Sequence, residues 1–240
     1  MGTAWAACVL GAAFSAVVWG RWWRSRRPAF AAWGTGLAIF AAAALTQALG
    51  QAHGFSVPLF RAFYLLGGVL GVIYLALGTA FLMTPAKVAR ACAAVLVVLT
   101  VFLAVDVSVV PVDASKLSTT AGVLGGALIG HGTPIFVAAV VFNILGTLVL
   151  AGGSAYSAIA YIRSRAPIDR VVCNVLLTIG ALVVALGFSL AKTVGGSLTE
   201  LGALEAVGAA IMFAGFLSLG RFGALQPARA QVVASAAADD

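Results

Sequence analysis

Five charged side chains fall inside or at the edges of long apolar stretches, and their types and positions suit them for chemistry. They are Arg61, Asp106, Lys192, Glu200 and Glu205. Asp106 precedes Pro111 by five residues, and Glu205 lies about six residues into its stretch. If both stretches are helices, the two carboxylates lie roughly 7 and 9 Å inside them. Carboxylates at such depth bind cations, relay protons or pair with basic side chains.

Two interpretations of these charges remain open. In the first, opposite charges neutralise each other in pairs and fix the order of the helices, with Arg61 paired to Glu200. In the second, the charged side chains belong to a polar cavity in the outer half of the protein that binds a cation or a small polar ligand. The ligand-binding set predicted on that basis is Asp106, Glu205, Arg61, Tyr64, Asn143, Gln47, Lys192 and Glu200.

Helices within a lipid bilayer are expected to position these side chains. Hydrophobic residues make up 62% of the chain and charged residues 9%, whereas charged residues make up about a quarter of a typical soluble domain. The mean hydropathy is +1.11. A chain this apolar, with so few charged residues, cannot cover a soluble core with charge. The composition therefore predicts an all-α integral membrane protein with seven apolar spans of sufficient length. The spans are 3–20, 29–50, 58–83, 89–111, 134–162, 170–191 and 199–220.

The distribution of basic residues predicts the orientation of the spans. Eleven of the 14 Lys and Arg residues fall in one alternate set of connectors and in the C-terminal tail, and the opposite side has Arg61, Lys116 and Lys192. Basic connectors face the cytoplasm. This places the N-terminus outside and the C-terminus in the cytoplasm, in a cytoplasmic membrane. Residues 1–223 form the seven-helix domain, and 224–240 are expected to be a disordered tail.

A short basic motif occurs twice and suggests an internal repeat. Arg24-Ser25-Arg26-Arg27-Pro28 returns as Arg163-Ser164-Arg165-Ala166-Pro167, at an offset of 139 residues. The same offset places the third span over the seventh. The pattern suggests a 3+1+3 plan of two parallel halves joined by the fourth span, as occurs in some transporters. Chance similarity between two basic turns is the alternative explanation.

This topology resembles those of SWEET-type sugar transporters and microbial rhodopsins, but the residues do not support either family. SWEET-type transporters have prolines in the first helix of each half, and 3–20 and the interior of 134–162 contain none. A retinal protein needs a lysine in its last helix, and 199–220 contains none. The likeness is one of topology, which does not determine function.

Several other functions are disfavoured by the sequence. The basic residues flank spans instead of clustering as in a nucleic-acid binder. His53 and His131 fall outside the spans, so neither a haem nor a metal site is expected, and no cofactor is predicted. The connector 112–133 is long and is either a lid over an outer cavity or a surface for a partner. We expect the bilayer as a partner, and either partner membrane subunits or a homo-oligomer.

Three functional classes follow from these observations. The favoured class is a small-molecule or ion binding or transport protein. The alternative is a non-catalytic accessory or assembly subunit of a larger membrane complex. An intramembrane lipid enzyme is the weakest of the three, because two carboxylates alone form a sparse catalytic set.

Overall fold

The computed structural model describes residues 2–114, 117, 129–193 and 197–219, and within 189–193 it describes the backbone alone. Seven helical spans in this part of the chain are long and apolar enough to cross a membrane, which confirms the predicted all-α, seven-span fold. The elements are α1 (Gly2–Ser25), α2 (Pro28–His53), α3 (Val57–Phe63), η1 (Tyr64–Leu70), α4 (Gly71–Met83), α5 (Ala86–Val109), α6 (Pro134–Thr147), η3 (Leu148–Gly152), α7 (Gly153–Arg163), α8 (Ile168–Thr193) and α9 (Leu198–Ser218).

The third and fifth spans each contain a π-helical segment that the sequence did not predict. The first, η1, joins α3 to α4, and the second, η3, joins α6 to α7. A π segment widens the helix by one residue per turn and leaves backbone carbonyls without their usual partners. Such segments are tolerated in a membrane where neighbouring helices supply new partners.

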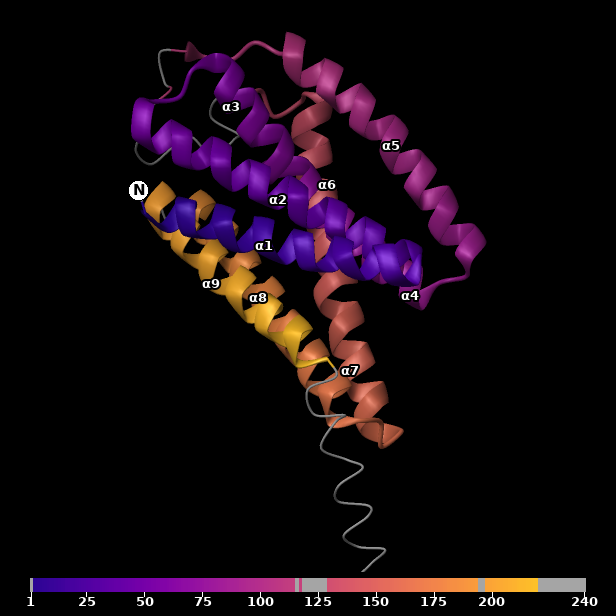
Figure 1. The fold of residues 1–240 in the computed structure, drawn as a ribbon. Coiled ribbons are helices and arrows are strands. Elements are labelled where there is room, and N and C mark those ends of the chain that lie inside the picture. Colours follow the sequence, from indigo (N-terminus) through magenta and orange to yellow (C-terminus); the bar gives the residue numbers. More distant parts are fainter. Residues whose placement is uncertain (1, 115–116, 118–128, 194–196, 220–240) are drawn as a thin grey trace, which may run out of the picture.

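The helices form a closed arrangement with one span outside it (Figure 1). α1 packs on α2, and α2 packs on α4. On the other side α8 packs on α9 and on α7. The two groups meet where α1 packs on α9 and where α4 packs on α6, and α5 lies along the edge of the molecule (Figure 1). We call the end of the bundle where α1 and α9 begin the N-terminal end, and the end with the turns after α1 and α7 the arginine-rich end.

Glycines allow a close crossing of α8 and α9. A Cβ atom on Gly208 of α9 would lie 2.7 Å from the carbonyl oxygen of Gly180 in α8, and a Cβ on Gly180 would lie 2.6 Å from the carbonyl oxygen of Gly208. The two backbones therefore touch directly, as small residues permit in membranes.

One face of α5 is exposed and apolar, as expected for a helix in contact with lipid. Val98, Val101, Val105 and Val109 are each at least 60% exposed and follow one another at helical spacing. The opposite face of α5 carries the buried side chain of Leu103. This span therefore has one protein-facing stripe and a wide surface suited to hydrocarbon.

The two turns of the repeated motif have the same unusual backbone conformation. Arg26 has φ 55° and Arg165 has φ 52°, and they are the two non-glycine residues with positive φ in the described chain. Each follows the last turn of a helix, α1 or α7, where a left-handed residue commonly ends a helix. Both turns lie at the arginine-rich end, where the Arg21 guanidinium also stacks over the Phe216 ring at 4.4 Å.

Two predictions concern segments that the structure leaves undescribed. The tail 224–240 lies outside the described residues, as do 118–128 of the long connector. At the described end of that connector, Ile129 is 1% exposed and packs in the apolar core near the N-terminal end. The proposal of a lid or a partner surface in 112–133 therefore stays a prediction.

Candidate functional site: a central cavity at Glu205

The position of Glu205 is set by the start of α9. Ser197 caps this helix with a reciprocal pair of hydrogen bonds: its hydroxyl accepts from the Glu200 backbone N–H at 3.2 Å, and its own N–H donates to the Glu200 carboxylate at 2.8 Å. This capping box fixes the first turn of α9. Glu205 follows Leu198 by two turns on the buried face of the helix, so its side chain points into the bundle.

A cavity of about 50 Å³ lies between the two groups of helices. One water needs roughly 10–15 Å³ of such space, so the cavity suits a few waters or a small ion. Its polar lining residues are Glu205 from α9 and Asn143 and Thr147 from α6. The apolar wall is Phe40, Ala43, Gly67, Gly71, Val72, Leu75, Leu150, Ala181, Val184, Ala185, Phe188 and Met212.

The carboxyl group of Glu205 is the most unusual feature of this cavity. The residue is 4% exposed, and its Oε2 atom has no hydrogen-bond partner among the residues that the structure describes. A carboxylate transferred from water to an apolar site without compensation is strongly disfavoured. Glu205 therefore needs either a proton or a bound cation to be stable at this position.

Asn143 links the cavity wall to the π segment of the third span. Its amide nitrogen donates to the carbonyl oxygens of Gly68 at 2.6 Å and of Ala139 at 2.7 Å. Gly68 lies within η1, so the amide of Asn143 provides an extra partner for a backbone group at a non-α-helical site. Both of these hydrogen bonds use the side-chain nitrogen of Asn143, so its side-chain oxygen takes no part in them.

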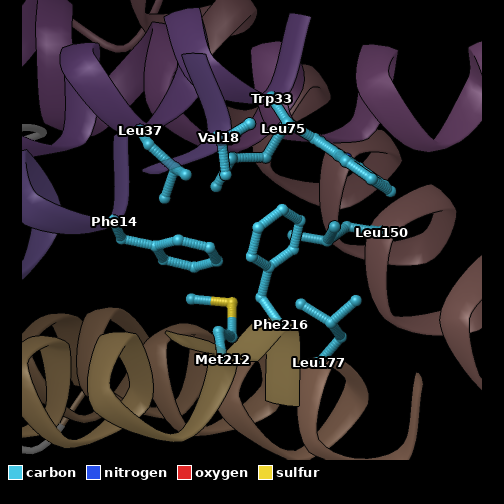
Figure 2. Close-up of a pocket in the computed structure, with 9 residues that line it drawn as sticks. All are labelled: Phe14, Val18, Trp33, Leu37, Leu75, Leu150, Leu177, Met212 and Phe216. Carbon is cyan, nitrogen blue, oxygen red and sulfur yellow. The ribbon is translucent and has the colours of Figure 1, made fainter. Parts of the chain in front are cut away.

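A second, smaller cavity lies next to the first, toward the arginine-rich end (Figure 2). It holds about 20 Å³, and its lining is entirely apolar: Phe14, Val18, Trp33, Leu37, Leu75, Leu150, Leu177, Met212 and Phe216. Phe14 of α1 and Phe216 of α9 lie next to each other on its lining, with ring centroids 5.4 Å apart. Leu75, Leu150 and Met212 line both cavities. These three side chains therefore separate the polar cavity from the apolar one.

The structure brings together part of the predicted ligand-binding set. Glu205 and Asn143 line the same cavity. Gln47 is fully buried nearby on α2, and its amide nitrogen donates to the carbonyl of Leu198 at 2.8 Å. Tyr64 is buried against Phe60, with ring centroids 6.0 Å apart, and does not line this cavity.

The remaining predicted residues take other positions. Asp106 accepts a hydrogen bond at 2.9 Å from the backbone N–H of Ile135, in the first turn of α6. Arg61 donates to the carbonyl of Val110 at 2.9 Å. None of the three charged residues Asp106, Arg61 and Glu200 lines the central cavity. The side chain of Lys192 lies outside the described part of α8.

The expected ion pair between Arg61 and Glu200 is not formed. Arg61 donates its hydrogen bond to the carbonyl of Val110, directly after α5, and Glu200 is exposed and completes the capping box of α9. The expectation failed because matching positions in a sequence alignment of two halves need not be neighbours in space. A two-fold axis brings equivalent residues together when they lie close to that axis, and these two lie at separate helix starts.

Two site residues were missed. Thr147 lies one turn after Asn143 and lines the cavity, and the spacing of four residues was a signal for a shared helix face. Gln51 is 6% exposed, and neither polar atom of its amide has a partner in the described chain. It was missed because the hydropathy of the second span falls just before Gln51, whereas α2 continues to His53.

Comparison of the chain with protein-family models, with curated proteins and with solved structures gives no match. Within the described residues, no group of three His, Cys, Asp or Glu side chains could hold a metal ion.

Proposed function

We propose that this multi-pass membrane protein binds a small cation at Glu205 and carries it across the membrane. The observation that supports this proposal best is a buried carboxyl group with an unpartnered oxygen, on a cavity lined by α2, α4, α6, α8 and α9. An intramembrane carboxyl facing a cavity is typical of ion and proton pathways. The small volume excludes a large organic substrate in this conformation.

The position of the cavity between two groups of helices suits a carrier. One wall comes from α2, η1 and α4, and the other from α6, η3, α8 and α9. A rocking motion of one group against the other would open the cavity alternately to the two sides. In this conformation, Leu75, Leu150 and Met212 stand between Glu205 and the apolar cavity toward the arginine-rich end. They are the proposed barrier on that side.

The proposal includes the 3+1+3 repeat, with α5 as the connecting span. Two features support it. The equivalent turns have matching left-handed residues, at Arg26 and Arg165. The contacts between the groups also match, because a two-fold axis that relates the halves exchanges the α1–α9 pair with the α4–α6 pair. The π segments depart from the repeat, since they fall in the third and fifth spans.

We further propose that the arginine-rich end faces the cytoplasm of a cell whose cytoplasmic membrane holds the protein. The arginine turns and the aromatic contacts of Arg26 with Trp22 and Trp23 fit a membrane interface on that side. Single cysteines at Ser25 and Ala52 test this in a cysteine-free background. A membrane-impermeant maleimide should label the Ala52→Cys variant in intact cells, and the Ser25→Cys variant should react after permeabilisation. The reverse pattern contradicts the orientation.

The carrier function is tested with purified protein in vesicles under imposed gradients of H⁺, Na⁺ or K⁺. We expect wild-type protein to move one of these ions and the Glu205→Gln variant to lose that flux. Glu200→Gln is the matched control, because it removes a carboxylate from the same helix at an exposed position outside the cavity. Equal flux in wild-type and Glu205→Gln protein, or no flux of any of the three ions, contradicts the proposal.

The second candidate function is an accessory or assembly subunit. The observation in its favour is the exposed apolar face of α5, which lies at the edge of the bundle and could pack against another membrane chain. Lipid satisfies the same face, so the test is co-purification in mild detergent. A subunit is recovered with a defined partner chain, and the Glu205→Gln variant assembles with it normally.

A further inference from the structure

Two buried glutamines of α2 lie between the N-terminal end of the bundle and the Glu205 cavity. Gln47 is 0% exposed and Gln51 is 6% exposed. The side-chain oxygen of Gln47 and both polar atoms of the Gln51 amide have no partner within the described chain. Buried polar groups nearly always have partners, and ordered water supplies them where protein groups do not. Three such atoms, on two residues that lie one helical turn apart, therefore indicate a hydrated place inside the protein.

The geometry of α2 connects these glutamines with the cavity. Phe40 and Ala43 line the cavity. Gln47 follows one turn after Ala43, and Gln51 one turn later, so all three positions lie along one side of the helix. α9 runs beside this path at its start, because the Gln47 amide donates to the carbonyl of Leu198. A Cβ on Gly202 would lie 3.2 Å from the Gln47 amide nitrogen, which places α9 against Gln47 one turn before Glu205.

We infer that the carried ion is a proton, which reaches Glu205 from the N-terminal end along water molecules held by Gln51 and Gln47. This inference rests on the proposed function, because it takes Glu205 as the site of the carried ion. A glutamine amide both donates and accepts hydrogen bonds, so it can orient water in a chain. At the end of the chain, an O–H bond of a hydrated proton breaks and an O–H bond of the Glu205 carboxyl forms, which leaves one neutral water behind.

A proton suits this site better than a metal cation. Na⁺ or K⁺ would require several oxygen ligands around it, and the polar side chains on the cavity in the described chain are one carboxyl, one amide and one hydroxyl. A protonated carboxyl needs no such ligand shell and is neutral, so it is compatible with the apolar wall.

Few other charged or titratable groups lie on the helices around Glu205. Glu200 is exposed in the capping box, and Arg61 bonds the carbonyl of Val110. Other such groups toward this end include His53, which is exposed, Tyr64, which packs on Phe60, Asp106, which bonds Ile135, and Lys192, whose side chain is undescribed. None of these described groups lines the cavity, and a proton on the carboxyl would neutralise Glu205 without a counter-ion.

The test is infrared spectroscopy of the full chain in lipid vesicles, with exchange from H₂O into D₂O. The wild-type minus Glu205→Gln difference spectrum should contain the C=O stretch of a protonated carboxyl, and this band should shift in D₂O. Gln51→Leu should slow that shift by about tenfold or more, since it removes hydrogen-bond partners for water on the path. The Gln51 side chain has no hydrogen bond to lose within the described chain, so this variant should fold. Thr46→Val is the control, because Thr46 bonds a carbonyl of its own helix.

Three results would overturn the inference. Absence of the carboxyl band from acidic to alkaline pH means that Glu205 is charged and holds another cation. Loss of the band on addition of Na⁺ or K⁺ at constant pH means that the metal ion competes for the site. An unchanged exchange rate in Gln51→Leu means that the proton takes another path. A normal band and exchange in a protein that moves no ion would instead contradict the proposed function alone.

Discussion

The crossing of α8 and α9 gives a quantitative prediction for the substitution Gly208→Ala. The new Cβ would lie 2.7 Å from the Gly180 carbonyl oxygen and 2.5 Å from a methyl carbon of Val184, whereas ordinary contact begins near 3.4 Å. The helices must therefore separate by about 0.7 Å, and gaps of this size forfeit a quarter to a half of each dispersion contact. The two helices have the most extensive packing in the described structure.

Overpacking of this kind costs about 1–3 kcal/mol. The higher helix propensity of alanine returns about 1 kcal/mol, so the net loss in the free energy of unfolding is up to about 2 kcal/mol. For a chain of this size that lowers the melting temperature by up to roughly 8 °C. The assay is thermal unfolding in mild detergent, followed by circular dichroism.

Gly20→Ala is the matched control for this substitution. A Cβ at Gly20 meets no atom within 4 Å, so this variant gains helix propensity without a clash and should melt at or slightly above wild type. The reasoning is refuted if the Gly208→Ala protein melts at the same temperature as the Gly20→Ala protein, or higher. In that case the backbone contact between the two helices would not limit their approach.

Two further substitutions test the structural roles of charged residues. Asp106→Ala removes the acceptor for the Ile135 N–H at the start of α6 and should lower the free energy of unfolding by about 1–2 kcal/mol. Asp106→Asn keeps an acceptor and should lower the free energy of unfolding less. Ion flux should persist in both variants, and loss of flux in Asp106→Asn would place Asp106 in the transport site. Arg165→Gly should raise the free energy of unfolding by up to about 1 kcal/mol, because glycine adopts the positive φ of this turn without strain. The control Arg24→Gly, within the last turn of α1, should lower the free energy of unfolding by about 1 kcal/mol. A loss of stability in Arg165→Gly would show that the arginine side chain matters more than the backbone.

The fold class could be predicted from the sequence because a membrane imposes strong constraints. A span of about 20 apolar residues satisfies both its backbone and its side chains in lipid, and the seven predicted spans match the seven helices. The ends were less predictable. α1 continues to Ser25 through its arginines and tryptophans, because a helix passes through the interface without interruption while hydropathy falls there.

The candidate site could be predicted in part. Glu205 and Asn143 were found because a polar group in an apolar stretch stands out at any helical phase. Asp106 stands out equally, yet it binds the start of α6. Hydropathy does not distinguish a carboxylate that caps a neighbouring helix from one that faces a cavity. That distinction depends on which helices are neighbours, and the π segments that shape the cavity leave no mark in composition.

The two carboxylates show how this fold separates structural from functional charge. Asp106 has a backbone N–H to bind, so its charge is compensated by a helix start and it contributes to stability. Glu205 has no such partner at its Oε2 atom and lies against apolar walls, so its burial opposes folding unless an ion joins it. The direct backbone contact of Gly180 and Gly208 holds α9 in place despite this opposition. A bundle that retains an uncompensated carboxyl at the junction of its two groups of helices gains no stability from it, which is why we propose an ion-binding role for Glu205.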